Sequence, residues 1–172
     1  MRTSTAPKSR LGRALRLIAD AAALPAASVA HPFAPATALP RRVFGTGEGP
    51  PPKRAVTWGH ALIGLGLGIA AWILLSFIVL TFARGALYGL FDRGPYDDSW
   101  GGPTLAGAWT VHFVTSTVFQ IAALFVVAGI GALNRRLSGA FRGGESPWWA
   151  WLVAVTVCAV TALFVVAWSA QI

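Results

Sequence analysis

Small or polar side chains recur at every fourth position along one otherwise apolar stretch of this sequence. The positions are Thr104, Ala108, His112, Ser116 and Gln120, with Thr115 beside them. Residues four apart lie on one face of a helix, so the spacing predicts a single polar stripe. In hydrocarbon such groups need hydrogen-bond partners, so the stripe must face other helices or a wet cavity. Two interpretations stay open: hydrogen bonds that only hold a helix bundle together, and a small polar cavity that opens to the outside.

His112 is the member of this stripe best suited to chemistry, because imidazole is the side chain that changes charge nearest neutral pH. In the cavity interpretation His112 binds a ligand or a quinone head group, or it gains and loses a proton. A second histidine, His60, lies in a different apolar run. We expect the two about 15 Å apart across the bilayer, which is too far to share one haem iron. The sequence therefore predicts neither a cofactor nor a metal, and the single cysteine, Cys158, is expected to be structural.

Composition identifies the environment in which these groups work. The 172 residues are 55% hydrophobic and only 12% charged, whereas soluble domains average about 25% charged. A soluble chain of this size lacks the interior volume to bury so much apolar surface. The composition therefore predicts an all-α integral membrane protein and argues against a soluble enzyme.

Three long runs carry almost no charge and satisfy the requirement of about 20 apolar residues for a membrane-spanning helix. We predict spans over 58–82, 105–133 and 148–168, which together form a three-helix transmembrane domain over 57–172. Glycine and proline before the second and third runs, at 101–103 and 143–147, indicate turns. The predicted architecture is thus three spans joined by two short loops.

The distribution of basic residues predicts the orientation of these spans. Of the 14 basic residues, all except Arg84 and Arg93 lie before the first span or in the loop 134–147. The positive-inside rule places that side in the cytoplasm. We therefore expect the N-terminus inside, the loop 84–103 outside and the C-terminus outside, in the inner membrane of a bacterium.

Residues 1–56 form a basic cytoplasmic tail of a different character. A short amphipathic helix is predicted over about 10–24, with Arg10, Arg13 and Arg16 placed to contact anionic lipid or a protein partner. A mitochondrial presequence and a disordered segment are the alternatives. A proline-rich linker follows, which is expected to be extended and to contain no helix. Nucleic acid is not an expected partner, because stacking aromatic residues are scarce.

The first span carries a stripe of small residues, at His60, Gly64 and Gly68. Membrane helices associate through close backbone approach, so this face is expected to dock another helix, from this chain or a second copy.

The stretch 96–112, YDDSWGGPTLAGAWTVH, resembles part of a membrane sensor domain of actinobacteria that often precedes a histidine kinase. In that family an outside loop ends in a Trp-Gly-Gly-Pro-type turn and leads into a helix. The resemblance covers roughly 55–142. The sequence shows no counterpart of the family's first helix pair, adds the helix 148–168 and has no kinase region. The resemblance implies a sensor whose output requires a separate partner protein.

Catalytic constellations such as Ser-His-Asp, HExxH or paired intramembrane carboxylates are missing from the sequence. We therefore expect a non-enzymatic membrane protein that senses or relays a signal through a partner. The alternative is a small accessory subunit of a larger respiratory or transport complex, in which both stripes serve only for docking.

Overall fold

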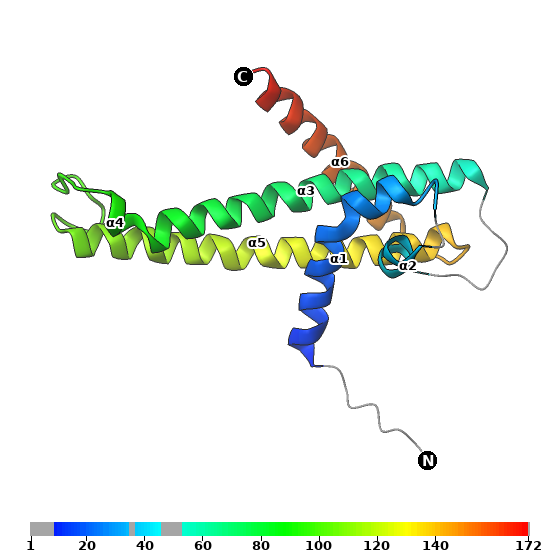
Figure 1. Ribbon diagram of the computed structural model, residues 1–172, viewed down its shortest axis with the longest axis horizontal. Coiled ribbons are helices and arrows are strands. Elements are labelled where there is room, and N and C mark those ends of the chain that lie inside the picture. The colour runs from blue at the N-terminus through cyan, green and yellow to red at the C-terminus, as the bar shows by residue number, and fades with distance from the viewer. Residues whose placement is uncertain (1–8, 35–36, 46–52, 172) are drawn as a thin grey trace, which may run out of the picture. The chain divides into compact units, whose positions relative to one another are not determined.

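The computed structural model describes residues 9–34, 37–45 and 53–171, and helices make up all the regular secondary structure of this part of the chain (Figure 1). The prediction of an all-helical protein is confirmed. The helices are α1 (Arg10–Ala30), α2 (Ala38–Phe44), α3 (Arg54–Ala86), α4 (Tyr88–Phe91), α5 (Leu105–Phe141) and α6 (Trp148–Ser169).

Three of these helices, α3, α5 and α6, are long and apolar enough to cross a membrane, as the sequence predicts. The first two are longer than expected, with 33 and 37 residues against 22 in α6. At 1.5 Å per residue, α3 and α5 span about 50 and 55 Å, whereas the hydrocarbon core is about 30 Å thick. Both helices are therefore longer than a span perpendicular to the bilayer requires.

The chain divides into two compact units, one formed by Met1–Ala71 with Val127–Ile172 and the other by Trp72–Val126. Helices α3 and α5 each contribute one part to each unit. The first unit also contains α1, α2 and α6, and the second contains α4 and the loop that follows it.

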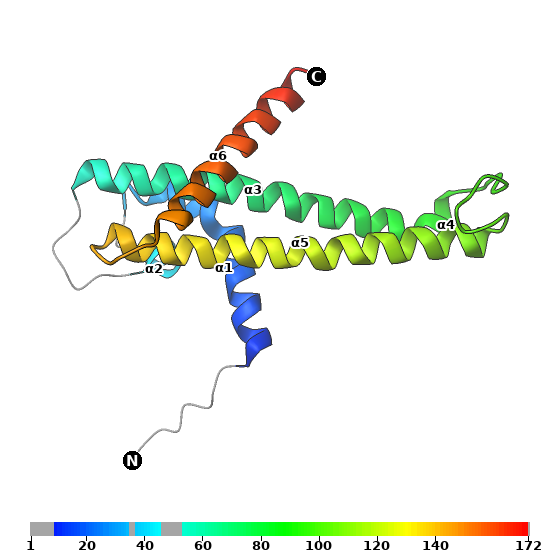
Figure 2. The same cartoon turned by 180° about the vertical axis from the view of Figure 1, so that it is seen from behind.

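In the first unit, α1 packs against α3 and α5, which Figures 1 and 2 show from opposite sides. Gly131 of α5 lies directly against the backbone of Leu17, and Gly68 of α3 lies under the ring of Pro25. A Cβ atom at Gly68 would come within 2.6–2.8 Å of that ring. Glycine is therefore needed at both crossings, because any side chain would push α1 away.

Helix α6 makes a smaller contact within the same unit. Its buried residues are Ala150, Ala154 and Thr161, and its cysteine, Cys158, lies against Gly66 of α3. The thiol donates a weak hydrogen bond to the carbonyl of Ile63 at 3.7 Å. Cys158 thus has a packing role, while residues 162–171 are exposed.

The expectation that the proline-rich segment contains no helix is wrong for its described part. Helix α1 continues through Pro25 to Ala30, and α2 contains Pro40. Pro40 lies in the first turn of α2, where the missing N–H would have no intrahelical acceptor. Pro25 does interrupt the ladder of α1, but its ring fills the space that Gly68 leaves. The tail that was expected to be disordered is therefore folded over 9–34 and 37–45, while the predictions for 1–8 and for the run Pro50–Pro52 fall outside the described residues.

In the second unit, the end of α3 and the start of α5 pack as an antiparallel pair. The indole N–H of Trp109 donates to the carbonyl of Gly85 at 3.2 Å, and the indole ring covers Gly89. Ser116 packs against the same Gly85 about two turns further along α5. Because Gly85 and Gly89 have no side chains, Ser116 and Trp109 of α5 can lie directly against their backbone.

Candidate functional site

A pocket of about 510 Å³ lies in the second unit, between α4, the loop 95–100 and α5. Tyr88 lines it from α4, and Val111, His112 and Thr115 line it from α5. The loop contributes Pro95, Tyr96, Asp97, Asp98, Ser99 and Trp100. This set is called the loop pocket below. Its volume lies within the range of about 300–1,000 Å³ that is usual for small-molecule sites.

His112 is held in one orientation within this pocket. Its Nδ1–H donates to the carbonyl of Ala108 at 2.9 Å, one turn earlier in α5. Its ring stacks on that of Tyr88, with centroids 3.9 Å apart and planes inclined by 9°. Because Nδ1 carries the proton in this bond, Nε2 of the neutral ring is an acceptor. No hydrogen bond joins Nε2 to any residue of the described chain, so this atom remains available to a ligand.

The loop on the other side of the pocket is organised by Asp92. Its carboxylate accepts a hydrogen bond from the N–H of Gly94 at 3.0 Å, and its carbonyl accepts one from the Tyr96 hydroxyl at 2.9 Å. The Gly94 bond is the main reason that the pKa of Asp92 lies below its usual value, with a smaller contribution from the Tyr88 hydroxyl. The pKa of Tyr88 is raised by partial desolvation and by the same carboxylate. The charge of Asp92 is thus stabilised beside the His112–Tyr88 stack.

The end of the loop is pinned to the start of α5. Gly101 lies in direct contact with the backbone of Gly107, and a side chain at either position would overlap the other residue. Thr104 accepts a hydrogen bond from the N–H of Gly107 at 3.1 Å, which satisfies one of the unpaired donors of the first turn. The loop therefore returns to the helix at a defined point, and this places residues 95–100 over His112.

The predicted polar stripe separates into three structural roles. Thr104 caps α5, while His112 and Thr115 line the loop pocket. Ser116 faces Gly85 of α3. Gln120 is half-buried without a hydrogen bond in the described structure. The stripe thus brings two of its members, His112 and Thr115, to one cavity.

The small-residue stripe of α3 faces α1 and α2. Gly64 lies against Ser28 and Phe44, and Gly68 against Pro25. His60 precedes both glycines in α3 and is buried. Its Nε2 lies 3.0 Å from the hydroxyl of Ser138 in α5. The face that was expected to dock a helix is occupied by the two helices of the N-terminal segment.

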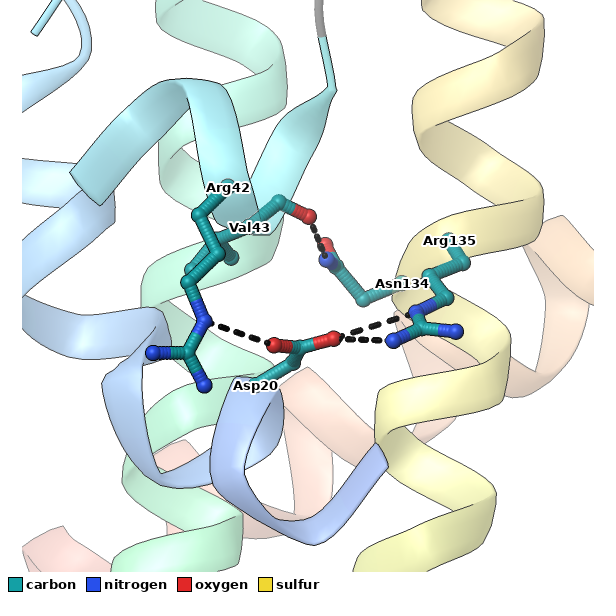
Figure 3. Close-up of polar contacts among 5 residues, drawn as sticks. All are labelled: Asp20, Arg42, Val43, Asn134 and Arg135. Atoms are coloured by element: carbon teal, nitrogen blue, oxygen red, sulfur yellow. Dashed lines mark hydrogen bonds and ion pairs between the residues drawn. The ribbon is translucent and has the colours of Figure 1, made fainter. Parts of the chain in front are cut away.

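The residues that hold α1 and α2 in place form a group that the sequence reasoning missed (Figure 3). It consists of Asp20, Arg42, Val43, Asn134 and Arg135, and is called the polar clamp below. The Asp20 carboxylate, 5% exposed, pairs with Arg42 at 3.4 Å and with both Nε and Nη2 of Arg135. Asn134 donates to the carbonyl of Val43 at 3.2 Å.

Helix α2 ends on side chains of α5. The last carbonyls of a helix have no intrahelical donor, and here those of Val43 and Phe44 accept hydrogen bonds from Asn134 and Arg142. With Ser138, these donors recur every fourth residue. That spacing, together with Asp20 as the only acidic residue before Glu48, was the signal available in the sequence.

The predicted lipid-contacting arginines, Arg10, Arg13 and Arg16, are all exposed. The apolar face expected beside them is not the buried one, since Leu11 and Leu15 are 69% and 56% exposed. The buried face of α1 is formed by Asp20, Ala21, Leu24, Ala27 and Ser28. Its C-terminal half therefore docks on the bundle, whereas its N-terminal half keeps both basic and apolar side chains free.

The described residues contain no group of three histidine, cysteine or acidic side chains that is suited to a metal ion. Comparison of the chain with protein-family models, curated proteins and solved structures gives no match.

Proposed function

We propose that this protein is a non-enzymatic membrane sensor or relay, in which the loop pocket binds a small ligand and α1 and α2 carry the response to a partner protein. The observation that carries the proposal is the pocket itself. It combines a fixed histidine with an unoccupied acceptor, Nε2 of His112, and a loop whose position is set by hydrogen bonds. Its polar side chains are not joined into a catalytic triad, because the Ser99 hydroxyl accepts from the N–H of Gly101 and His112 bonds the carbonyl of Ala108, and this favours binding over catalysis.

In the proposed topology the chain spans a bacterial inner membrane. The loop pocket lies on the outer side, and α1 and α2 lie on the cytoplasmic side. The support is the concentration of basic residues on the side of the polar clamp, since Arg42, Arg135 and Arg142 all lie there. Reporter fusions after Gly94 and at Ile172 test this topology. Cytoplasmic activity of either fusion would contradict it.

A route for the relay is available because α3 and α5 each take part in both units. Ligand-dependent movement of His112 or the loop would act on α5, which also supplies Asn134, Arg135 and Arg142 to α1 and α2. The similarity of residues 96–112 to an actinobacterial sensor domain agrees with this proposal.

The test compares variants in cells that lack the natural copy of the gene. His112→Ala and Tyr88→Leu should abolish the phenotype that the wild-type gene restores, while the amount of membrane protein and of co-purified partner stays unchanged. Thr117→Val is the matched control. Thr117 is on the same helix, and its hydroxyl donates to the backbone carbonyl of Phe113 one turn earlier. Full complementation by both pocket variants would refute the sensor function.

A role as accessory subunit of a larger membrane complex is the second candidate. The supporting observation is α6, which buries only Ala150, Ala154 and Thr161 and leaves most of its apolar surface exposed. Purification from native membranes in mild detergent distinguishes the two. Stoichiometric large subunits that depend on α6, and not on the pocket, would favour the accessory role.

A further inference from the structure

The lining of the loop pocket has a one-sided charge. Asp97 and Asp98 are exposed carboxylates that form no ion pair or hydrogen bond with the described residues, and the lining contains no lysine or arginine. Arg84 lines a separate neighbouring cavity together with Asp92, and Arg93 is exposed outside the lining of the loop pocket. An anionic ligand would therefore meet two uncompensated negative charges, whereas a cation would be attracted by both.

The other walls of the pocket are aromatic. Tyr88, Tyr96 and Trp100 contribute rings, and Trp100 is 96% exposed at the rim. Aromatic faces attract organic cations through their quadrupole and also cover apolar groups. At about 510 Å³ the space is much larger than a bare metal ion requires, and no set of three ligands suited to a metal is found among the described residues. These features favour an organic ion over an inorganic one.

We propose that the loop pocket binds a small organic ammonium cation with an apolar or aromatic body. The ammonium group lies toward Asp97 and Asp98, and its N–H donates to Nε2 of His112, which is an acceptor because Nδ1–H is bonded to Ala108. The body packs on the rings of Tyr88 and Trp100. This inference rests on the proposed function and specifies its ligand class.

The experiment uses the purified full-length protein in lipid nanodiscs and three probes of similar shape: 2-phenylethylammonium, 2-phenylethanol and 3-phenylpropanoate. Binding is measured by isothermal titration calorimetry at pH 7.5. We expect the ammonium probe to bind about tenfold more tightly than the alcohol, and the carboxylate probe not to bind. The Asp97→Asn, Asp98→Asn double variant should lower the affinity for the ammonium probe by about tenfold and leave the alcohol unaffected.

Glu145→Gln is the matched control, because it removes an exposed acidic charge that lies outside the pocket. Salt provides a second test that needs no variant, since the affinity of the ammonium probe should fall between 50 and 500 mM NaCl while that of the alcohol does not. Equal affinity for ammonium and alcohol, or an ammonium affinity that the double variant and salt do not change, would overturn the inference. If the alcohol binds best and Tyr88→Leu abolishes its binding, the cation inference fails while the pocket remains the ligand site of the proposed sensor.

Discussion

Asp20 and Arg135 lie 115 positions apart in the chain, and their side chains form an ion pair between α1 and α5. Both Nε and Nη2 of Arg135 donate to one oxygen, Oδ2, of the Asp20 carboxylate. The carboxylate is 5% exposed, whereas the guanidinium side chain is 46% exposed. The pair therefore joins the N-terminal segment to a helix long enough to span the membrane, at the position where charged residues begin in that helix. Arg42 of α2 binds the same carboxylate, so one acidic group connects three helices.

Replacement of either member should release α1 from the bundle. Asp20→Asn and Arg135→Gln are each expected to cost about 1–3 kcal/mol of local docking free energy, since the partner charges are half-exposed and therefore screened. Hydrogen–deuterium exchange of residues 10–30 in nanodiscs should accelerate accordingly. Arg136→Gln is the control, because Arg136 lies beside Arg135 in sequence and only covers the Trp149 ring. Equal acceleration in the control would show that the clamp is not responsible.

Asn134→Leu should loosen α2 without affecting the pocket in the second unit. The substitution removes the donor to the Val43 carbonyl and leaves that acceptor buried, which costs about 1–3 kcal/mol. We expect faster exchange over 38–44 and an unchanged response of the protein to pocket ligands in calorimetry. Unchanged exchange over 38–44 would mean that Asn134 does not hold α2.

Gly68→Ala and Gly59→Ala should have opposite effects, although both residues lie in α3. Alanine favours a helix over glycine by about 1 kcal/mol, and a Cβ atom at Gly59 meets nothing within 4 Å. At Gly68 the same atom would overlap the Pro25 ring, so α1 must shift. Thermal unfolding in detergent should show Gly59→Ala as neutral or stabilising and Gly68→Ala as destabilising. A stabilising Gly68→Ala would contradict the close crossing of α1 and α3.

Docking of the N-terminal segment should weaken in acid. Burial lowers the pKa of His31 below its usual value of 6.5, so the folded state binds fewer protons there than the unfolded state. Its stabilising contribution is therefore complete above about pH 6.5 and declines as the pH falls below that value. The groups around it add positive charge, since His60 lies 5.4 Å away between ring centroids and Arg142 reaches the Phe44 carbonyl beside it.

His31→Phe provides the comparison, because phenylalanine keeps the aromatic contact with Phe44 and does not titrate. The difference in melting temperature between wild type and variant should move in favour of the variant from pH 8 to pH 5. Subtracting the two curves isolates the contribution of His31, including its interaction with the His60 ring 5.4 Å away. A difference that stays constant with pH would exclude His31 as the acid-sensitive group.

The exposed N-terminal half of α1 should respond to anionic lipid. Arg10, Arg13 and Arg16 project from it together with Leu11 and Leu15, and each basic residue near such a surface contributes about 1 kcal/mol. Replacing phosphatidylcholine by phosphatidylglycerol in nanodiscs should slow exchange over 10–19, and the triple Arg→Gln variant should lose this effect. An equal effect in the variant would show that these charges do not bind the lipid.

Sequence alone was sufficient for the class of the protein and for its three long apolar helices. Their signal is local: a span is recognised from the hydropathy of its own residues, whatever lies beside it. The four-residue spacing predicted a single polar stripe, and the structure places His112 and Thr115 at the loop pocket and Ser116 against Gly85. The prediction of an extended linker was wrong. It used only the local density of proline, whereas Pro25 lies within α1 because its ring packs against Gly68 of α3.

Only the tertiary structure decided which of these residues meet. Nothing in the local pattern around Asp20 identifies Arg135 as its partner, and nothing around His112 indicates that Tyr88 stacks on it or that residues 95–100 close a pocket over both. Contacts of this kind depend on where two helices cross and on which positions are glycine at the crossing. The periodicity of one helix can be read from its own residues. Which residues of two helices meet depends on how their surfaces pack together.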